Sequence, residues 1–157
     1  MTEVNYLYLV DMLQSKEYNI ENVKKQYLLL LSNLSVTKYI TTKKFVENLE
    51  CINEMGSIIV GVVNDNSNNY EIVASGTIII EPKIIRDGKC VGHIEDIVVA
   101  KHMRGKGISQ EILKRLKDYA RDNNCYKVTL ECFEEVKKIY SKCGFKVNGV
   151  QMVDYFM

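Results

Sequence analysis

Residues 99–110 (VAKHMRGKGISQ) have the composition of an anion-binding loop. They follow an apolar run that predicts a strand and precede a run with the apolar period of a helix. The first amide groups of such a helix have no partner within it, and with the helix dipole they attract a negative group. Gly105 and Gly107 permit close backbone approach. Three basic side chains add positive charge: Lys101, Arg104 and Lys106. The segment predicts a pyrophosphate site that needs no metal.

The same loop excludes two other nucleotide-binding motifs. A P-loop would need Gly-Lys-Ser/Thr after a four-residue spacer, and the dinucleotide fingerprint would need G-x-G-x-x-G. A flexible loop with solvated lysines would fit an isolated pair of glycines. Here the strand before and the helix after supply the context that a phosphate-binding turn requires.

Two adjacent carboxylates, Glu95 and Asp96, interrupt the apolar strand before this loop. In a regular strand they would point to opposite faces, so one would be buried without a partner. A bulge or a wet cleft would relieve this conflict, and either carboxylate could then accept a proton from a substrate amine. An edge strand with both carboxylates in solvent is the alternative. His93 is a third candidate base, although a histidine at the start of a strand is more often structural.

The elements that must position these residues predict one domain over residues 1–157, of the α/β (α+β) class, with a mixed central sheet flanked by helices. Strands are expected at residues 5–10, 57–63, 70–81, 90–100 and 126–132 and from 145 onward. Helices are expected at residues 18–34, from 41 or 42 to about 54, at 108–120 and at 133–143. Residues 64–69 (NDNSNN) predict a turn.

Composition narrows the function further. The 21 basic and 20 acidic residues nearly cancel, so no general nucleic-acid or membrane partner is expected. No apolar stretch is long enough to span a bilayer. The five cysteines are odd in number and none are spaced as CxxC, which argues against zinc. Scattered single cysteines fit a reducing compartment, so we expect a cytoplasmic protein.

Two motifs resemble the GNAT superfamily of acetyltransferases. Arg104-Gly105-Lys106-Gly107-Ile108-Ser109 looks like its Q/R-x-x-G-x-G/A signature, with Ser109 in place of the usual Gly or Ala. Residues 140–145 (YSKCGF) look like its closing Y-x-x-x-G-F element. The resemblance implies the GNAT acyltransferase fold, with acetyl-CoA as co-substrate and no metal. It also implies that the strand before the loop bulges away from its neighbour and offers backbone amides to the cofactor at Ile97, Val98 and Val99.

A narrower similarity is to the glucosamine-6-phosphate N-acetyltransferases. It is carried by residues 79–85 (IIEPKII), 92–97 (GHIEDI), 125–127 (CYK) and 140–145. It implies acetylation of the amine of glucosamine 6-phosphate, a step toward UDP-N-acetylglucosamine, by a homodimer. The implied catalytic residues are Glu95, Asp96 and Tyr140. The implied substrate-binding residues are Ser35, Lys83, Arg86, Glu95, Asp96, Tyr126, Lys127 and Glu131.

Three roles remain open at this stage. Tyr140 is implied to protonate or hold the leaving thiolate, but it also falls on an apolar stripe and could be a core tyrosine. Each basic or acidic substrate residue could be an ordinary surface residue. Two positions depart from the family: Tyr155 stands where an arginine is usual near the phosphate, and Val136 replaces an asparagine.

Two other functions compete with this reading. One is a GNAT enzyme for a different amine, such as a polyamine, an antibiotic or a protein terminus. The other is a non-catalytic acetyl-CoA-binding module. The pair Glu95 and Asp96 together with Tyr140 favours an enzyme, and the basic residues Lys83, Arg86 and Lys127 favour an anionic substrate.

Overall fold

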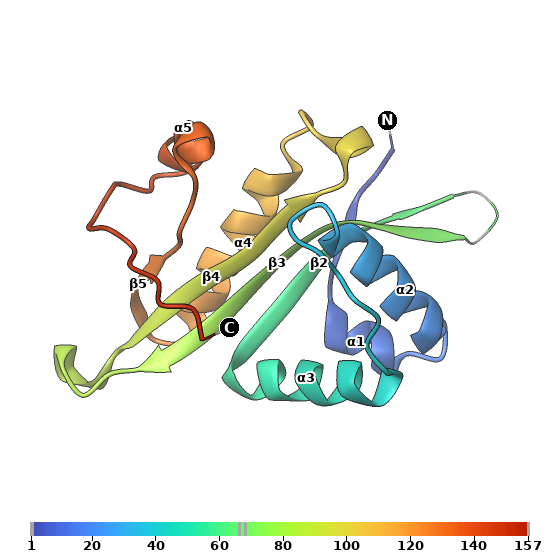
Figure 1. Ribbon diagram of the computed structural model, residues 1–157, viewed down its shortest axis with the longest axis horizontal. Coiled ribbons are helices and arrows are strands. Elements are labelled where there is room, and N and C mark those ends of the chain that lie inside the picture. The colour runs from blue at the N-terminus through green and yellow to red at the C-terminus, as the bar shows by residue number, and fades with distance from the viewer. Residues whose placement is uncertain (1, 66, 68, 157) are drawn as a thin grey trace.

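In the described part of the chain, five strands and five α-helices follow one another in the order that the sequence predicts, with one helix more and one strand fewer (Figure 1). The computed structural model describes residues 2–65, 67 and 69–156. Its strands are β1 (Asn5–Tyr8), β2 (Gly56–Asn64), β3 (Tyr70–Pro82), β4 (Cys90–Val99) and β5 (Cys125–Thr129). Its α-helices are α1 (Leu9–Gln14), α2 (Ile20–Leu31), α3 (Thr42–Met55), α4 (Ile108–Asp122) and α5 (Lys137–Lys142).

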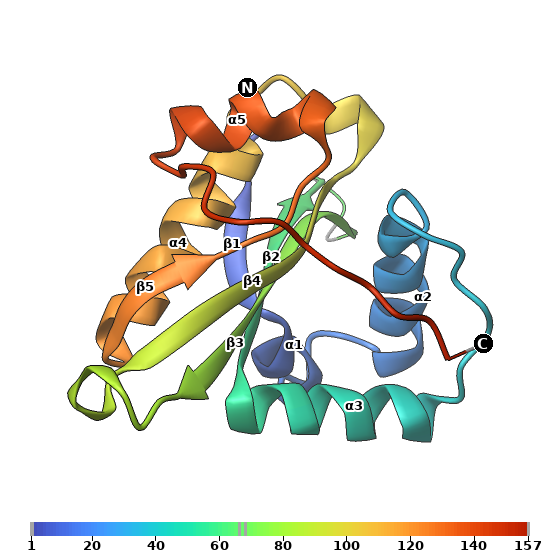
Figure 2. The ribbon, with the colours of Figure 1, turned by 60° about the vertical axis from the view of Figure 1, so that its left-hand side comes forward.

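One mixed sheet has the strand order β1-β2-β3-β4-β5. The pairs from β1 to β4 are antiparallel, and β5 joins β4 in parallel. Helices cover both faces: Tyr27 of α2 bonds to Ser75 of β3, whereas a Cβ on the next residue, Gly76, would meet Ile112 of α4. Figure 2 shows α4 on the opposite side of the sheet from α2 and α3. The expected class, a mixed sheet flanked by helices, is confirmed.

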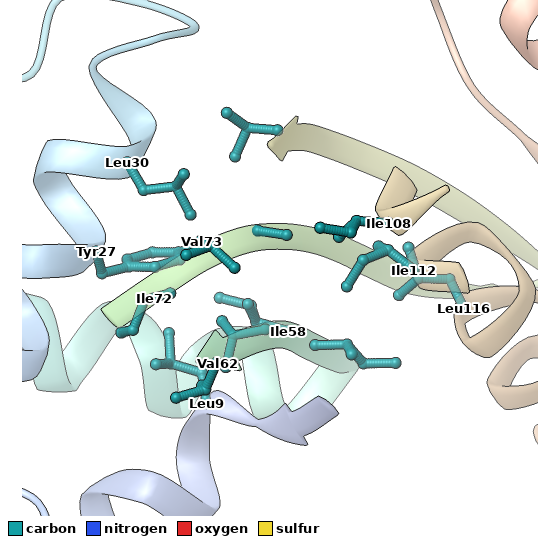
Figure 3. Close-up of a cluster of buried hydrophobic side chains, with 14 of the residues drawn as sticks. Leu9, Tyr27, Leu30, Ile58, Val62, Ile72, Val73, Ile108, Ile112 and Leu116 are labelled. Carbon is teal, nitrogen blue, oxygen red and sulfur yellow. The ribbon is translucent and has the colours of Figure 1, made fainter. Parts of the chain in front are cut away.

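The apolar periods of the sequence predict which helix faces are buried. The inward residues of α4 recur at helical spacing: Ile108, Ile112, Leu113, Leu116 and Ala120. They pack against β3 and β4, and α2, with Tyr27 and Leu30, covers β3 and β4 on the other side (Figure 3). Capping also follows expectation at α3, where the Thr41 hydroxyl accepts a hydrogen bond from the Lys44 amide at 3.1 Å.

The expected strand from residue 145 onward is wrong for the isolated chain. Residues 145–156 form no strand and are mostly exposed, with large apolar side chains in solvent at Val150, Met152 and Phe156. A strand needs a neighbour to bond its amide and carbonyl groups, and this segment pairs with none of the five described strands. Residue 157 lies outside the described residues.

Two smaller expectations need correction or restriction. The first strand was expected to reach Val10, but α1 begins at Leu9 because Leu9 and Met12, three residues apart, both turn into the core. The turn expected at residues 64–69 connects β2 to β3, and its positions 66 and 68 lie outside the described residues.

Candidate active site

The strand before the glycine loop carries a β-bulge at the two adjacent carboxylates. The register shifts here, so that Asp96 and Ile97 of β4 together stand opposite the single residue Gly76 of β3. Asp96 has a φ of 53°, in the left-handed region. Glu95 and Asp96 are both exposed. The bulge expected from the conflict of buried charge is therefore present.

Gly76 makes room for this bulge. A Cβ at Gly76 would lie 2.6 Å from a methyl group of Ile97 and 2.6 Å from one of Ile112 on α4. Because there is no side chain, Ile97 packs inward over β3 toward α4. The extra residue in β4 thus places an apolar side chain inside and leaves both carboxylates outside.

Among the strands that the structure describes, β4 has only β3 as a neighbour beyond its first four residues. Its parallel pairing with β5 runs from Cys90 to His93, and His93 pairs with Thr129, the last residue of β5. The chain then leads away from β4 to α5 (Figure 1). From residue 94 to 99, β4 bonds to β3 alone, so its other edge has amide groups free for a ligand. The expected cofactor residues Ile97, Val98 and Val99 lie in this stretch.

The glycine loop leads directly into α4. Gly107, with φ of 76°, precedes the first residue of α4 and provides no side-chain hydrogen bond to it. Gly105 also has positive φ, at 77°, and a Cβ there would meet nothing within 4 Å. In this structure the glycines are therefore needed for the turn of the backbone rather than to clear space. The amides of the first turn, including those of Ile108 and Ser109, face outward without a capping side chain.

Two of the three basic side chains of this loop, Arg104 and Lys106, are exposed beside the helix start. Arg104 donates from Nε to the Val99 carbonyl at 3.1 Å, which ties the loop back to the end of β4. The Lys106 ammonium lies 3.7 Å from the sulfur of Met103. Positive charge, an uncapped helix start and free strand amides are thus contiguous, which suits a pyrophosphate and the thioester arm that follows it.

The electrostatics of Glu95 differ from those of an ordinary surface glutamate. Partial burial raises its pKa above the usual value, and the negative charges of Glu131 and Asp96 raise it further. Glu131 lies just beyond β5 and accepts a hydrogen bond from Gln151 of the C-terminal segment. The structure therefore brings Glu95, Asp96 and Glu131 into one acidic group. A carboxylate with a raised pKa is better matched to proton transfer near neutral pH.

His93, the third candidate base, has partners on both ring nitrogens. Nε2 lies 2.6 Å from Oε2 of Glu81, and Nδ1 lies 3.2 Å from Oγ1 of Thr129. Neither nitrogen is free to take a proton from an amine. The structural reading of His93 is the better supported one.

The basic residues expected to hold an anion form two groups. Arg86 and Lys127 meet at Tyr126, with the Arg86 guanidinium 5.5 Å and the Lys127 ammonium 5.6 Å from the ring centroid. Lys83 is instead paired with Glu81, the partner of His93. Arg86 lies in the turn between β3 and β4 with a φ of 57°, and its side chain reaches Tyr126 of β5.

Tyr140 is half-buried on α5, with its ring 6.2 Å from that of Phe145. Burial raises the pKa of its hydroxyl, and the neighbouring thiols of Cys132 and Cys143 raise it further. The hydroxyl is therefore protonated at neutral pH and able to donate. Tyr140 also packs against the core, so the core reading and the chemical reading both apply to it.

Three other positions named from the sequence lie outside the acidic group of Glu95, Asp96 and Glu131. Ser35 is exposed on the loop from α2 to α3. Figure 2 shows this loop on the far side of α2, away from β5. Tyr155 is 80% exposed in the C-terminal segment. Val136 lies at the end of a short 3-10 turn before α5. The single chain does not bring Ser35 or Tyr155 to the carboxylates.

Sequence reasoning missed Tyr27, which lies beneath the bulge. Its hydroxyl is 3.2 Å from Oγ of the buried Ser75, and burial raises its pKa to about 12, with the charge of Asp96 adding to the shift. The available signal was Ser75 and Thr77, two polar residues within the otherwise apolar stretch 72–80 of β3. Glu81 and Thr129, the partners of His93, were missed because only the register places them beside it.

Within residues 2–65, 67 and 69–156, no cluster of three or more His, Cys, Asp or Glu side chains is placed to hold a metal ion. No helix in the described ranges combines the length and apolar character needed to cross a membrane.

The sequence model of the acetyltransferase (GNAT) family matches residues 29–145. The chain is 35% identical over 141 residues to glucosamine 6-phosphate N-acetyltransferase of Arabidopsis thaliana, covering 90% of this chain and 95% of that protein. It is 36% identical to glucosamine 6-phosphate N-acetyltransferase 1 of Dictyostelium discoideum, covering 92% of each. The crystal structure of the Arabidopsis thaliana enzyme superimposes with a TM-score of 0.82 and 30% identity over 99% of both chains. The chain belongs to the acetyltransferase (GNAT) family.

Proposed function

We propose that this chain transfers the acetyl group of acetyl-CoA to the amine of glucosamine 6-phosphate, giving N-acetylglucosamine 6-phosphate and CoA. The observation that carries the proposal is the bulge of β4. It sets two exposed carboxylates beside a strand edge with free amides, directly before an uncapped helix. The names of the relatives from Arabidopsis thaliana and Dictyostelium discoideum support the choice of amine.

Acetyl-CoA supplies the activated acetyl group, and the chain's own groups hold it. The amides at the start of α4 bind the pyrophosphate, with Arg104 and Lys106 adding charge. Within Ile97, Val98 and Val99 of β4, the amides that point away from β3 bind the thioester arm and polarise its carbonyl. No metal takes part. The steric fit of a ligand here depends on the positive φ of Gly105 and Gly107, which keeps the loop backbone open.

The two proton transfers of the reaction are assigned to different side chains, one on the amine side of the site and one on the thiol side. Glu95 or Asp96 accepts the proton of the amine, directly or through water, and the amine attacks the thioester carbonyl within a ternary complex. The carbon–sulfur bond then breaks, and the hydroxyl of Tyr140 donates a proton to the leaving thiolate. The raised pKa of Glu95 supports its role as the base, and the raised pKa of Tyr140 keeps its hydroxyl protonated before the thiolate leaves.

Recognition of the sugar phosphate falls to the basic side chains. Arg86 and Lys127, gathered at Tyr126, and Lys83 bind the phosphate, because charge-assisted bonds to phosphate are strong. Glu131 binds sugar hydroxyls or the ammonium. Ser35 takes part only if another subunit brings it to the site, since in one chain it lies apart from the carboxylates.

We also propose a homodimer in the cytoplasm. The C-terminal segment leaves Val150, Met152 and Phe156 in solvent, a cost that a second subunit would remove. All five cysteines are free thiols, which fits a reducing compartment.

The function is tested by thiol release from acetyl-CoA with a panel of amines. Glucosamine 6-phosphate, glucosamine, a polyamine, an aminoglycoside and a peptide N-terminus are compared at equal concentration. We expect glucosamine 6-phosphate to give the highest kcat/KM. Lys127→Met should raise the KM for glucosamine 6-phosphate and leave that for glucosamine unchanged. Equal rates with and without the phosphate, or a faster unphosphorylated amine, would assign the chain to another substrate.

A further inference from the structure

A chain of hydrogen bonds crosses three strands on the face of the sheet that carries Glu95. Glu81 of β3 bonds to His93 of β4 at 2.6 Å, and His93 bonds to Thr129 of β5 at 3.2 Å. His93 and Glu95 are two residues apart in β4, so their side chains lie on the same face. Glu81 also bonds to Lys83 through its other carboxylate oxygen. These hydrogen bonds link Lys83, on the candidate phosphate side of the site, to β4, the strand that bears the carboxylates.

The hydrogen-bond partners of His93 determine which of its two ring nitrogens donates a proton. The bonds from Lys83 and His93 lower the pKa of Glu81, so its carboxylate is ionised and only accepts. Nε2 of His93 must therefore carry a proton and donate to Glu81. The other nitrogen, Nδ1, is then engaged with the Thr129 hydroxyl. This arrangement holds the imidazole ring in one orientation between β3 and β5.

These hydrogen bonds lie at the point where β4 and β5 separate. His93 and Thr129 form the last pair of the parallel β4–β5 ladder, and β5 ends there. The bulge follows three residues later on β4, at Asp96. A side-chain bond across the last pair determines where the two strands part. It therefore influences how widely the free edge of β4 opens.

We propose that Glu81, His93 and Thr129 are positioning residues that hold the β4–β5 fork at the width required by the thioester. His93 acts through β4 and Thr129 through β5, and neither exchanges a proton with substrate. This inference rests on the proposed acetyl transfer. Loss of one bond lets the fork move, which misplaces the amides of residues 97–99 relative to Glu95. A displacement of that kind lowers turnover steeply although the fold remains.

Thr129→Val, which keeps the shape of the side chain and removes its hydroxyl, tests the proposal, with Thr129→Ser as the matched control. We expect Thr129→Val to lower kcat by about tenfold or more and to weaken acetyl-CoA binding, measured by calorimetry without amine. The KM for glucosamine 6-phosphate should change less than about twofold, because the amine side is not touched. The melting temperature should stay within about 4 °C. Thr129→Ser should restore the wild-type values.

His93→Gln and the double variant separate positioning from direct chemistry. If the two residues act through one bond, His93→Gln should lower kcat by a factor similar to Thr129→Val, and the double variant by no more than either. A loss with His93→Gln far larger than with Thr129→Val would make His93 a direct participant and overturn the proposal. Wild-type kcat and acetyl-CoA affinity in a folded Thr129→Val would overturn it as well. If Thr129→Val does not fold, His93→Gln with the calorimetric measurement is the test.

The proposed function can fail separately. A wild-type protein that binds acetyl-CoA but does not release thiol with glucosamine 6-phosphate would refute the substrate. The acetyl-CoA affinities of Thr129→Val and Thr129→Ser would still decide whether the fork is held by this bond.

Discussion

The hydroxyl of Tyr27 on α2 lies 3.2 Å from the hydroxyl of Ser75 on β3, directly under the bulge of β4. Ser75 is fully buried and Tyr27 is 6% exposed. Burial raises the pKa of Tyr27 to about 12, and the charge of Asp96 adds to the shift, so α2 lies within the field of the candidate site. A polar contact therefore joins α2 to β3 beside Gly76, the residue opposite the bulge.

Tyr27→Phe should reduce the free energy of unfolding by about 1–2 kcal/mol, because the Ser75 hydroxyl would lose its partner in the interior. Urea unfolding measures the change. Tyr39→Phe is the matched control, since Tyr39 is 82% exposed on a loop and should change stability little. Equal stability of the two variants would show that the buried bond contributes nothing.

Glu131→Gln should move the acidic limb of the kcat profile to lower pH. Glu95 must be deprotonated to act as a base, and the negative charge of Glu131 raises the pKa of Glu95. Removing that charge lowers this pKa, so activity persists to a more acidic pH. Glu50→Gln, on an exposed face of α3, should leave the limb in place. An unmoved limb in Glu131→Gln would argue that Glu95 is not the titrating group.

Gly107→Val should weaken acetyl-CoA binding by about tenfold or more, equivalent to about 1.4 kcal/mol, measured by calorimetry. Gly107 has a φ of 76° at the start of α4, a conformation that a β-branched residue resists, so the first amides of the helix would turn away from the pyrophosphate. Gly149→Ala, also at positive φ but in the C-terminal segment, is the control. Unchanged affinity with an intact fold would reject the loop as the pyrophosphate site.

Tyr140→Phe should lower kcat on the order of 10²-fold while acetyl-CoA affinity changes little, because only the proton donor is removed. Steady-state rates and calorimetry measure the two effects. Cys132→Ser, at the thiol beside Tyr140, should stay active since direct transfer needs no cysteine. Mass spectrometry of the enzyme mixed with acetyl-CoA alone should find no acetyl adduct. A kinetically competent adduct on any cysteine would contradict direct attack.

Light scattering at micromolar concentration should give the mass of a dimer. The exposed apolar residues of the C-terminal segment are the expected contact, so deleting residues 150–157 should shift the mass toward that of one chain. A full-length protein that stays monomeric would contradict the proposal. In that case Ser35 would also have no route to the carboxylates.

Much of the fold could be predicted because its signals are local. The stripe from Ile108 to Ala120 predicts the buried face of α4, and the capping of α3 by Thr41 follows from residue type and position. The final strand could not be predicted correctly, because whether residues 145–156 pair depends on a neighbouring strand rather than on their own composition. The start of α1 was missed because the strand and helix periods overlap at Leu9.

For the site, the sequence by itself indicated the glycine loop before α4, the pair of adjacent carboxylates and a bulge as one way to relieve their conflict. Each follows from the types and spacing of neighbouring residues. Only the tertiary structure decided that Ile97 turns inward over Gly76, that Tyr27 lies beneath Asp96, and that His93 spans Glu81 and Thr129. These relations depend on the register between strands and on the packing of helices, which join residues far apart in the chain, and no local spacing encodes them.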